Sequence, residues 1–154
     1  MTSDEHCLHL GGLLGNFQSL EFILRVYLQQ LPSARPSGIP YAVSIYTFPV
    51  GSVLPENEIT SYDSLGILID KFNKEMTKKQ QPLIDKGIVE VRDAIAHGRI
   101  SAEIHEFELR LIKFTKPQNG KVTVLFNEIM TADWFKNNKK RVNDAILLVH
   151  KNIR

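Results

Sequence analysis

Apolar residues near the start of the chain recur at spacings of three and four, which is the period of a helix. Within residues 8–31 the repeating positions are Leu13, Phe17, Leu20, Leu24 and Leu28. We therefore expect an amphipathic helix that ends at Pro32, because proline cannot continue a helix. Gly11 and Gly15 lie four residues apart on one helix face, where they permit either close internal packing or contact with a second copy of the chain.

Two more helices are expected in the middle of the chain. The second begins near Thr60 or Ser61 and has an apolar stripe of Leu65, Leu68, Ile69, Phe72 and Met76. The third spans residues 82–98, with Pro82 in its first turn and Gly98 as its cap. Its expected buried side chains are Leu83, Ile84, Ile88, Val91 and Ile95. Residues 32–60 hold five of the seven prolines, which predicts an irregular segment in which residues 41–48 could form a short strand.

The period changes to two near residue 107. Alternation through Leu109 and Leu111, and again through Val122, Val124 and Phe126, predicts strands over 107–114 and 121–126. The Asn119-Gly120 pair between them indicates a hairpin turn. A last helix should begin at a Thr131 cap and turn Trp134, Phe135, Val142, Ile146 and Val149 inward. The pattern predicts a mainly α fold, in which a β-hairpin is inserted before the last of four bundled helices.

Composition narrows the class of protein. A chain of 154 residues that is 43% hydrophobic is expected to form a single domain over residues 1–154. Basic residues exceed acidic ones by only two, so binding to nucleic acid would need a local patch, for which residues 137–141 are the best candidate. Cys7 is the only cysteine, which excludes an internal disulfide. The acidic start and the lack of a long apolar run predict a cytoplasmic protein that does not enter membranes.

The stretch EVRDAIAHGRIS, residues 90–101, gathers charged side chains at the end of the third helix. Asp93 and His97 are four residues apart, so the carboxylate could hold the imidazole. Arg92 lies roughly 140° around the helix from His97, and a second helix or subunit would bring the two groups together more easily. Arg99 and His105 repeat the Arg/His spacing, so the spacing by itself carries little information.

The residues around this spacing add more. The string RDAIAHG resembles the signature of the HEPN superfamily, in which an arginine, four to six residues and a histidine follow one another. Arg92, Asp93 and His97 fill the characteristic positions, and small residues surround the histidine as in the family. Glu21 and Arg25 on the first helix match the charged pair that many members carry. The resemblance covers about a dozen residues in motif and about two thirds of the chain in helix order, and it implies a HEPN-like bundle.

The resemblance implies a metal-independent endoribonuclease of toxin or defence type, with RNA as substrate and no cofactor. His97 would be the general base for the 2′-hydroxyl, and Arg92 would bind the phosphate. Asp93 would orient His97, and Arg99 would hold a neighbouring phosphate. The products would carry 2′,3′-cyclic phosphate and 5′-hydroxyl ends. Many members place two Arg/His sets in one groove, so a homodimer is expected, as is a cognate antitoxin partner.

One position departs from the family pattern, and two alternatives stay open. Some HEPN toxins carry a tyrosine two residues after the histidine, where an antitoxin enzyme nucleotidylates it, whereas this chain has Arg99. His6, His9, His105 and His150 show no metal-ligand spacing. The first alternative is a HEPN-like module that binds RNA or a protein without cleavage. The second is an unrelated helical interaction protein that uses Gly11 and Gly15, with Asp93 and His97 as an ordinary helix-surface pair.

Overall fold

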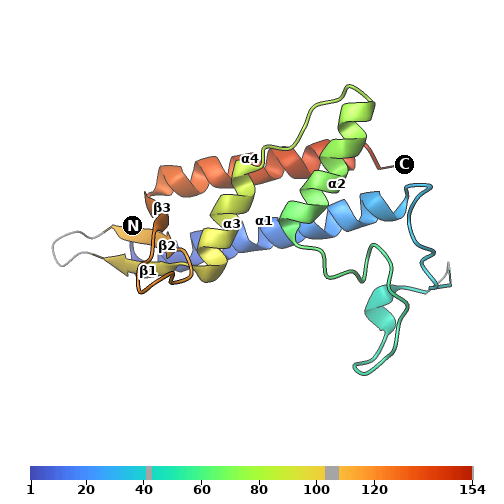
Figure 1. Cartoon of the computed structure of the whole chain (residues 1–154), viewed down its shortest axis with the longest axis horizontal. Coiled ribbons are helices and arrows are strands. Elements are labelled where there is room, and N and C mark those ends of the chain that lie inside the picture. The colour runs from blue at the N-terminus through green and yellow to red at the C-terminus, as the bar shows by residue number, and fades with distance from the viewer. Residues whose placement is uncertain (41–42, 103–107, 154) are drawn as a thin grey trace. The chain divides into compact units, whose positions relative to one another are not determined.

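The computed structural model describes residues 1–40, 43–102 and 108–153, which form four α-helices, a 3-10 helix and a three-stranded antiparallel sheet (Figure 1). The elements in order are α1 (Ser3–Gln29), η1 (Ile45–Thr47), α2 (Leu65–Lys78), α3 (Gly87–His97), β1 (Arg99–Ala102), β2 (Leu109–Phe114), β3 (Val124–Ile129) and α4 (Ala132–His150). The structure thus confirms that four helices form, in the predicted order along the chain.

The chain divides into two compact units. The first consists of Met1–Leu20 and Asp85–Ile146, and the second of Glu21–Ile84 and Leu147–Arg154. Helix α1 therefore contributes residues 3–20 to the first unit and residues 21–29 to the second. The single domain and the HEPN-like bundle stay predictions.

The sheet of the first unit has the order β1-β2-β3, with β2 in the middle. Arg99 pairs with Ile112 where β1 meets β2, and Arg110 pairs with Ile129 where β2 meets β3. Leu111 of β2 is fully buried, on the sheet face that receives α3. The buried hydrophobic side chains of this unit are Leu13, Phe17, Leu20, Ile88, Val91, Ala94, Leu111, Met130, Phe135, Val142 and Ala145.

Side-chain caps explain where α1 and α4 begin. The Glu5 amide donates to Thr2 Oγ1 at 3.2 Å, and the Thr2 amide donates to Glu5 Oε2 at 2.8 Å. This reciprocal capping box starts α1 at Ser3, earlier than the apolar repeat predicts. The Trp134 amide donates to Thr131 Oγ1 at 3.0 Å, which confirms the predicted cap of α4.

The second unit is organised around α2. Its five predicted apolar residues, from Leu65 to Met76, are all buried, which confirms the predicted stripe. Tyr27 meets Phe72 edge to face with ring centroids 5.0 Å apart. The helix begins later than predicted because Ser64 is its cap, with its hydroxyl accepting from the Ile67 amide.

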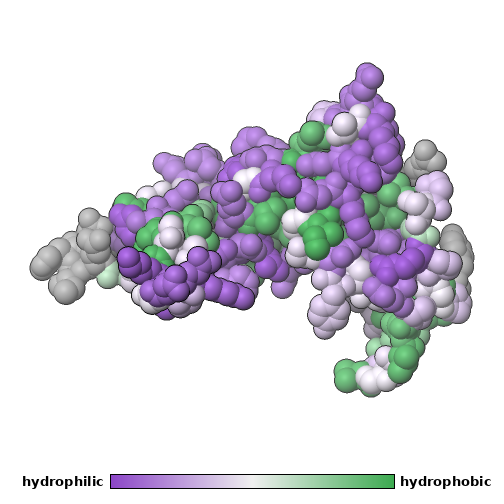
Figure 2. Space-filling view, in the orientation of Figure 1, coloured by the Kyte–Doolittle hydropathy of each residue, from purple (hydrophilic) through white to green (hydrophobic). Residues whose placement is uncertain are grey.

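The segment between α1 and α2 contributes little to the apolar core. Figure 2 shows hydrophobic residues on the surface around η1, where Tyr46, Val50 and Val53 are almost entirely exposed. Among the described residues of 32–60, the buried ones are Asn57 and Glu58, which are both polar. Polar contacts therefore hold this segment in place.

Two further predictions do not match the described residues: the possible strand over 41–48 and the start of the third helix. Residues 41 and 42 of the predicted strand lie outside the described part, and Ile45–Thr47 form a 3-10 helix because Ser44 caps it. The third helix begins at Gly87 instead of Pro82, and Leu83 is 54% exposed. The Asn73 side chain binds both the amide and the carbonyl of Ile84, at 2.8 and 2.9 Å, and this holds the preceding residues out of a helix.

The hairpin turn is confirmed, but its second strand is displaced. Asn119 and Gly120 have φ of 51° and 72°, as the predicted turn requires. Thr115 and Thr123 bond to each other beyond that turn, so β3 begins at Val124. Val122 and Val124, two of the residues that suggested the strand over 121–126, are each 51% exposed. Strand β1 was not predicted.

None of the helices in the described ranges is both long enough and apolar enough to cross a membrane.

Candidate functional site around the end of α3

The end of α3 carries the residues of the predicted Arg/His site in the first unit. Ile88, Val91 and Ala94 form the buried stripe of this helix. Arg92 and Asp93 lie beside that stripe and are partly exposed, while His97 is the last helical residue and is exposed. A substrate in solution can therefore reach the imidazole of His97 and the guanidinium of Arg92.

Asp93 binds neighbours other than the predicted one. Its Oδ1 lies 3.4 Å from Arg92 Nη1, and its Oδ2 lies 3.8 Å from Lys113 Nζ. No hydrogen bond between Asp93 and His97 is found in the part of the chain that the structure describes. Lys113 offers the carboxylate a full positive charge from β2, on the same sheet face as Leu111. In this structure Asp93 therefore positions Arg92 instead of His97.

Lys113 is the site residue that was not predicted. Its side chain is 21% exposed and follows the inward positions of Leu109 and Leu111 along β2. The sequence signal that could have identified it is its place in the alternation, since Lys113 follows two inward-facing leucines at the same spacing. A lysine on the inner face of a sheet needs a nearby partner for its charge.

Gly98 fixes the position of His97 against the sheet. Its amide donates to the Ala94 carbonyl at 2.7 Å, so glycine is the helix cap as predicted. Its φ is −81°, and the need for glycine comes from space. A Cβ atom here would lie 2.4 Å from the Ala94 oxygen and 2.9 Å from the Ile112 oxygen. The close approach joins α3 directly to β1.

Arg99 lies on the other side of the sheet from Asp93 and Lys113. It pairs with Ile112, which alternates with Leu111 and Lys113 along β2. Its guanidinium carbon lies 5.6 Å from the centroid of the Phe114 ring. Arg99 is thus close to His97 in the chain but faces a different surface.

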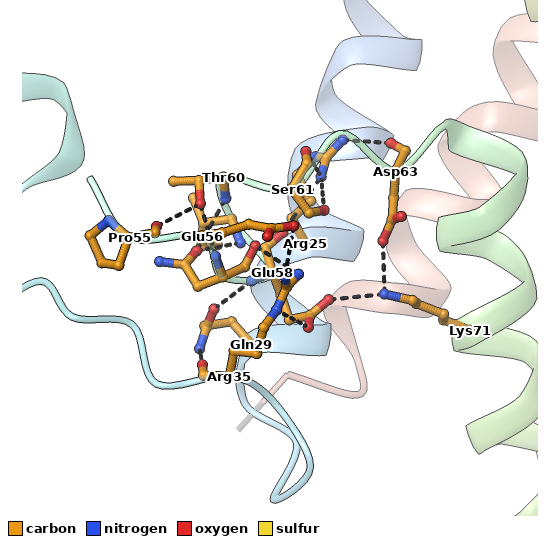
Figure 3. A network of polar contacts seen from close by, with 12 residues as sticks. Arg25, Gln29, Arg35, Pro55, Glu56, Glu58, Thr60, Ser61, Asp63 and Lys71 are labelled. Carbon is orange, nitrogen blue, oxygen red and sulfur yellow. Dashed lines mark hydrogen bonds and ion pairs between the residues drawn. The ribbon is translucent and has the colours of Figure 1, made fainter. Parts of the chain in front are cut away.

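Arg25 anchors a loop in the second unit. Its Nη1 donates to the Ser61 carbonyl at 2.8 Å and to the Ser61 hydroxyl at 2.9 Å, and its Nη2 donates to the Asp63 carbonyl at 2.8 Å (Figure 3). These bonds fasten the chain before α2 to α1. Glu21 precedes it by one helical turn and is partly buried. These contacts give Arg25 a structural role that does not require an RNA ligand.

Ion pairs extend this anchor. Lys71 Nζ lies 2.7 Å from Asp63 Oδ2 and 3.1 Å from Glu58 Oε2 (Figure 3). The hydrogen bond from Lys71 lowers the pKa of Asp63, and the same bond raises the pKa of Lys71. The Gln29 side chain accepts from the Glu58 amide at 3.0 Å. Together these contacts make the loop part of the folded unit.

The basic run at residues 137–141 has internal partners. Lys139 Nζ lies 3.4 Å from His9 Nδ1, Lys140 pairs with Asp144 at 2.6 Å, and Arg141 pairs with Asp85 at 2.6 Å. The Arg141 guanidinium lowers the pKa of Asp85. Neighbouring acids thus offset much of the positive charge that made this run the best predicted RNA patch.

His6 is a buried histidine that the sequence did not distinguish. It is 5% exposed, and neither of its ring nitrogens has a hydrogen-bond partner in the described residues. The ring meets Phe135 edge to face at 5.3 Å and lines a cavity of about 760 Å³ with residues that include Leu109 and Met130. Burial lowers the pKa of His6, and His9 lowers it further. No group of three metal-ligating side chains is found among the described residues.

Comparisons with known proteins identify no relative. No family model matches the chain, and neither the curated proteins nor the solved structures contain a significant match.

Proposed function

We propose that the chain is a metal-independent endoribonuclease of the HEPN type. The observation that carries the proposal is the placement of Arg92 and His97 within the last two turns of α3, where both are accessible to solvent. Histidine titrates near neutral pH, and guanidinium binds phosphate oxygens in a bidentate manner. Together they can supply a general base and a phosphate-binding group for cleavage of RNA by its own 2′-hydroxyl.

In this mechanism His97 removes the proton from the ribose 2′-hydroxyl. The 2′-oxygen forms a bond to phosphorus, the bond from phosphorus to the 5′-oxygen breaks, and the leaving oxygen takes a proton from water, while His97 returns its proton to the solvent. The products are a 2′,3′-cyclic phosphate and a 5′-hydroxyl. Arg92 stabilises the additional negative charge on the phosphorane oxygens. Asp93 holds the Arg92 guanidinium from one side, so its proposed role is positioning.

A second copy of the chain would complete the site. Arg92 and His97 are separated by roughly 140° around one helix, so one copy presents the two groups in different directions. Two facing copies would place the arginine of one beside the histidine of the other. We therefore include a homodimer in the proposal.

The test is incubation of the purified chain with total RNA in excess EDTA. Wild type should produce cyclic phosphate and 5′-hydroxyl ends, and Arg92→Ala and His97→Ala should not. His150→Ala is a matched control, because His150 is an exposed histidine at the end of another helix, α4. Equal cleavage by all four proteins would show that a contaminant cuts the RNA, and absence of cleavage by wild type would refute the proposal.

A toxin or defence role in the cytoplasm follows from the same proposal. Expression of wild type should then slow growth, and His97→Ala should relieve the effect. Relief by co-expressed neighbouring genes would identify the antitoxin partner.

A non-catalytic HEPN-like binding module is the second candidate. It is favoured by the contacts of Asp93, which face Arg92 and Lys113 and leave the His97 ring without the carboxylate that would orient it. This function predicts RNA or protein binding that survives His97→Ala, with no cleavage by wild type.

A further inference from the structure

The three-stranded sheet has an inner face, which meets α3, and an opposite face. Each face takes its side chains from alternate positions of the strands. On β2 the inward residues are Leu109, Leu111 and Lys113, which meet α3. The strand pairing places the opposite set on the outer face: Arg99, Ser101, Arg110, Ile112, Phe114, Val124, Asn127 and Ile129. We call this set the outer face.

The outer face is accessible. Arg99, Ser101 and Asn127 are exposed, Val124 is 51% exposed, and the other members are partly exposed. The inward Leu111, by contrast, has no exposed surface. A sheet face with several apolar side chains and no buried residue is available for a partner.

The charge of the outer face is positive. It contains Arg99 and Arg110 and no acidic residue. Arg110 Nη1 donates to Asn127 Oδ1 at 2.9 Å, which holds its guanidinium across the strands. Because the chain as a whole is nearly neutral, two guanidinium groups on one small surface, neither paired with an acid among the described residues, favour a polyanion.

An aromatic ring accompanies the two arginines. Phe114 is partly exposed, and Arg99 lies over its ring at 5.6 Å. Aromatic rings and guanidinium planes are the surfaces on which unpaired bases stack, and an open sheet is a common support for them. A base-paired duplex has no free base to stack in this way.

We propose that the outer face binds single-stranded RNA, with bases stacked on Phe114 and Arg99 and the backbone bound by Arg110. The inference deepens the proposed ribonuclease function and rests on it for the claim that this RNA is the substrate. Arg99 follows His97 by two residues, so their Cα atoms lie within about 7 Å of each other. A strand that crosses β1 would therefore arrive at the His97 end of α3.

Binding is measured by fluorescence anisotropy with a labelled oligouridine, in the His97→Ala background so that the RNA stays intact. Arg99→Gln and Phe114→Leu should each weaken binding about tenfold, which corresponds to loss of one stacked base. Arg110→Gln should reduce the slope of log affinity against log salt by about 0.7, because Arg110 is the residue that binds the backbone. The same oligouridine paired with oligoadenosine should bind much more weakly.

Lys136→Gln is the matched control, because it removes one exposed positive charge from α4 in the same unit and should change affinity less than about twofold. Phe114→Leu keeps an apolar side chain in the sheet, and thermal melting checks its fold. If this variant unfolds, the exposed Arg99 tests the inference by itself. Wild-type affinity in Arg99→Gln, or equal affinity for the duplex, would overturn it.

Failure of the inference and failure of the proposed function give different results. Cleavage by wild type with no effect of the outer-face variants on binding or on rate would refute the binding surface alone. Selective oligouridine binding that these variants weaken, without cleavage by wild type, would support the surface and refute the ribonuclease.

Discussion

The ammonium of Lys113 on β2 lies 3.8 Å from the carboxylate of Asp93 on α3. This contact joins the sheet to the helix that carries the candidate site, and it draws Asp93 away from His97. A carboxylate that orients a catalytic histidine is central to activity, and its removal in serine proteases slows the reaction roughly 10⁴-fold. Asp93 has a different set of partners.

Asp93→Asn should therefore have a modest effect on the proposed RNA cleavage. We expect a loss of less than about tenfold in single-turnover rate, because the neutral amide still reaches Arg92. Loss of the carboxylate should not change the orientation of His97, because Asp93 is not bonded to that ring. His97→Ala, measured in parallel, should remove cleavage. A loss in Asp93→Asn as large as in His97→Ala would show that Asp93 turns to His97 when RNA binds.

Gly98→Ala should destabilise the first unit. The new methyl group would lie 2.4 Å from the Ala94 oxygen and 2.9 Å from the Ile112 oxygen, and both are backbone atoms that cannot rotate away. Overpacking of this kind lowers the free energy of unfolding by about 1–3 kcal/mol. Urea denaturation followed by circular dichroism measures the change.

Gly15→Ala is the control for this substitution. Gly15 lies inside α1, and a Cβ atom there would meet nothing within 4 Å. Alanine should raise stability by about 0.5–1 kcal/mol, because it favours the helix. A decrease in Gly15→Ala would mean that Gly15 serves a contact that the described residues do not contain.

The helices could be predicted from the sequence because each buries a stripe of mostly apolar residues. The stripes of α1 and α2 are buried at every predicted position, and Thr131 caps α4 as expected. The first residues of α2 and α3 were harder to place. Their positions depend on hydrogen bonds of the Ser64 and Asn73 side chains, which the spacing of hydrophobic residues does not reveal.

Strand β1 could not be predicted because its sequence, RISA, is only four residues long and its residues are all exposed, so it has no buried apolar face of its own. Pairing with β2 is what makes it a strand. For the same reason the site was only partly predictable. The positions of Arg92 and His97 on α3 follow from helix geometry, whereas the contact of Lys113 with Asp93 depends on strand register.

Arg25→Met should destabilise the second unit. The substitution keeps an unbranched side chain but removes the donors to Ser61 and Asp63, and it leaves the carbonyl of the buried Ser61 without its partner. Hydrogen bonds from charged groups contribute about 1.5–3 kcal/mol, so the free energy of unfolding should fall by at least about 2 kcal/mol.

Arg35→Met is the matched control for Arg25→Met. Arg35 pairs at 2.7 Å with Glu56, whose side chain is 72% exposed, and reaches Glu58 and the Asn57 carbonyl only at 3.5 and 3.4 Å, so its loss should matter less. Thermal melting of both variants measures the difference. Equal melting temperatures would argue against Arg25 as the anchor of the loop.

The acid sensitivity of the second unit follows from Asp63. Because Lys71 lowers the pKa of Asp63 below its usual 3.8, the folded state favours the carboxylate. The stabilisation is complete above the unfolded pKa and is lost as pH falls through the folded pKa. Lys71→Met should therefore flatten the decline in stability below about pH 4, when urea denaturation is repeated across that range. An unchanged decline would assign acid unfolding to other carboxylates.

His6 gives the first unit a second pH dependence at higher pH. Burial lowers the pKa of His6 below its usual 6.5, so protonation favours the unfolded chain. Stability should be constant above about pH 6.5 and should decrease below it, by at most about 1.4 kcal/mol per pH unit from this group. His6→Leu should remove that slope. It should also raise stability at pH 7 by about 1 kcal/mol, because neither ring nitrogen has a partner among the described residues.

His150→Gln, a change at an exposed histidine, should keep the wild-type slope between pH 5 and pH 7. If His6→Leu keeps it as well, another group titrates in that range and His6 is not the cause.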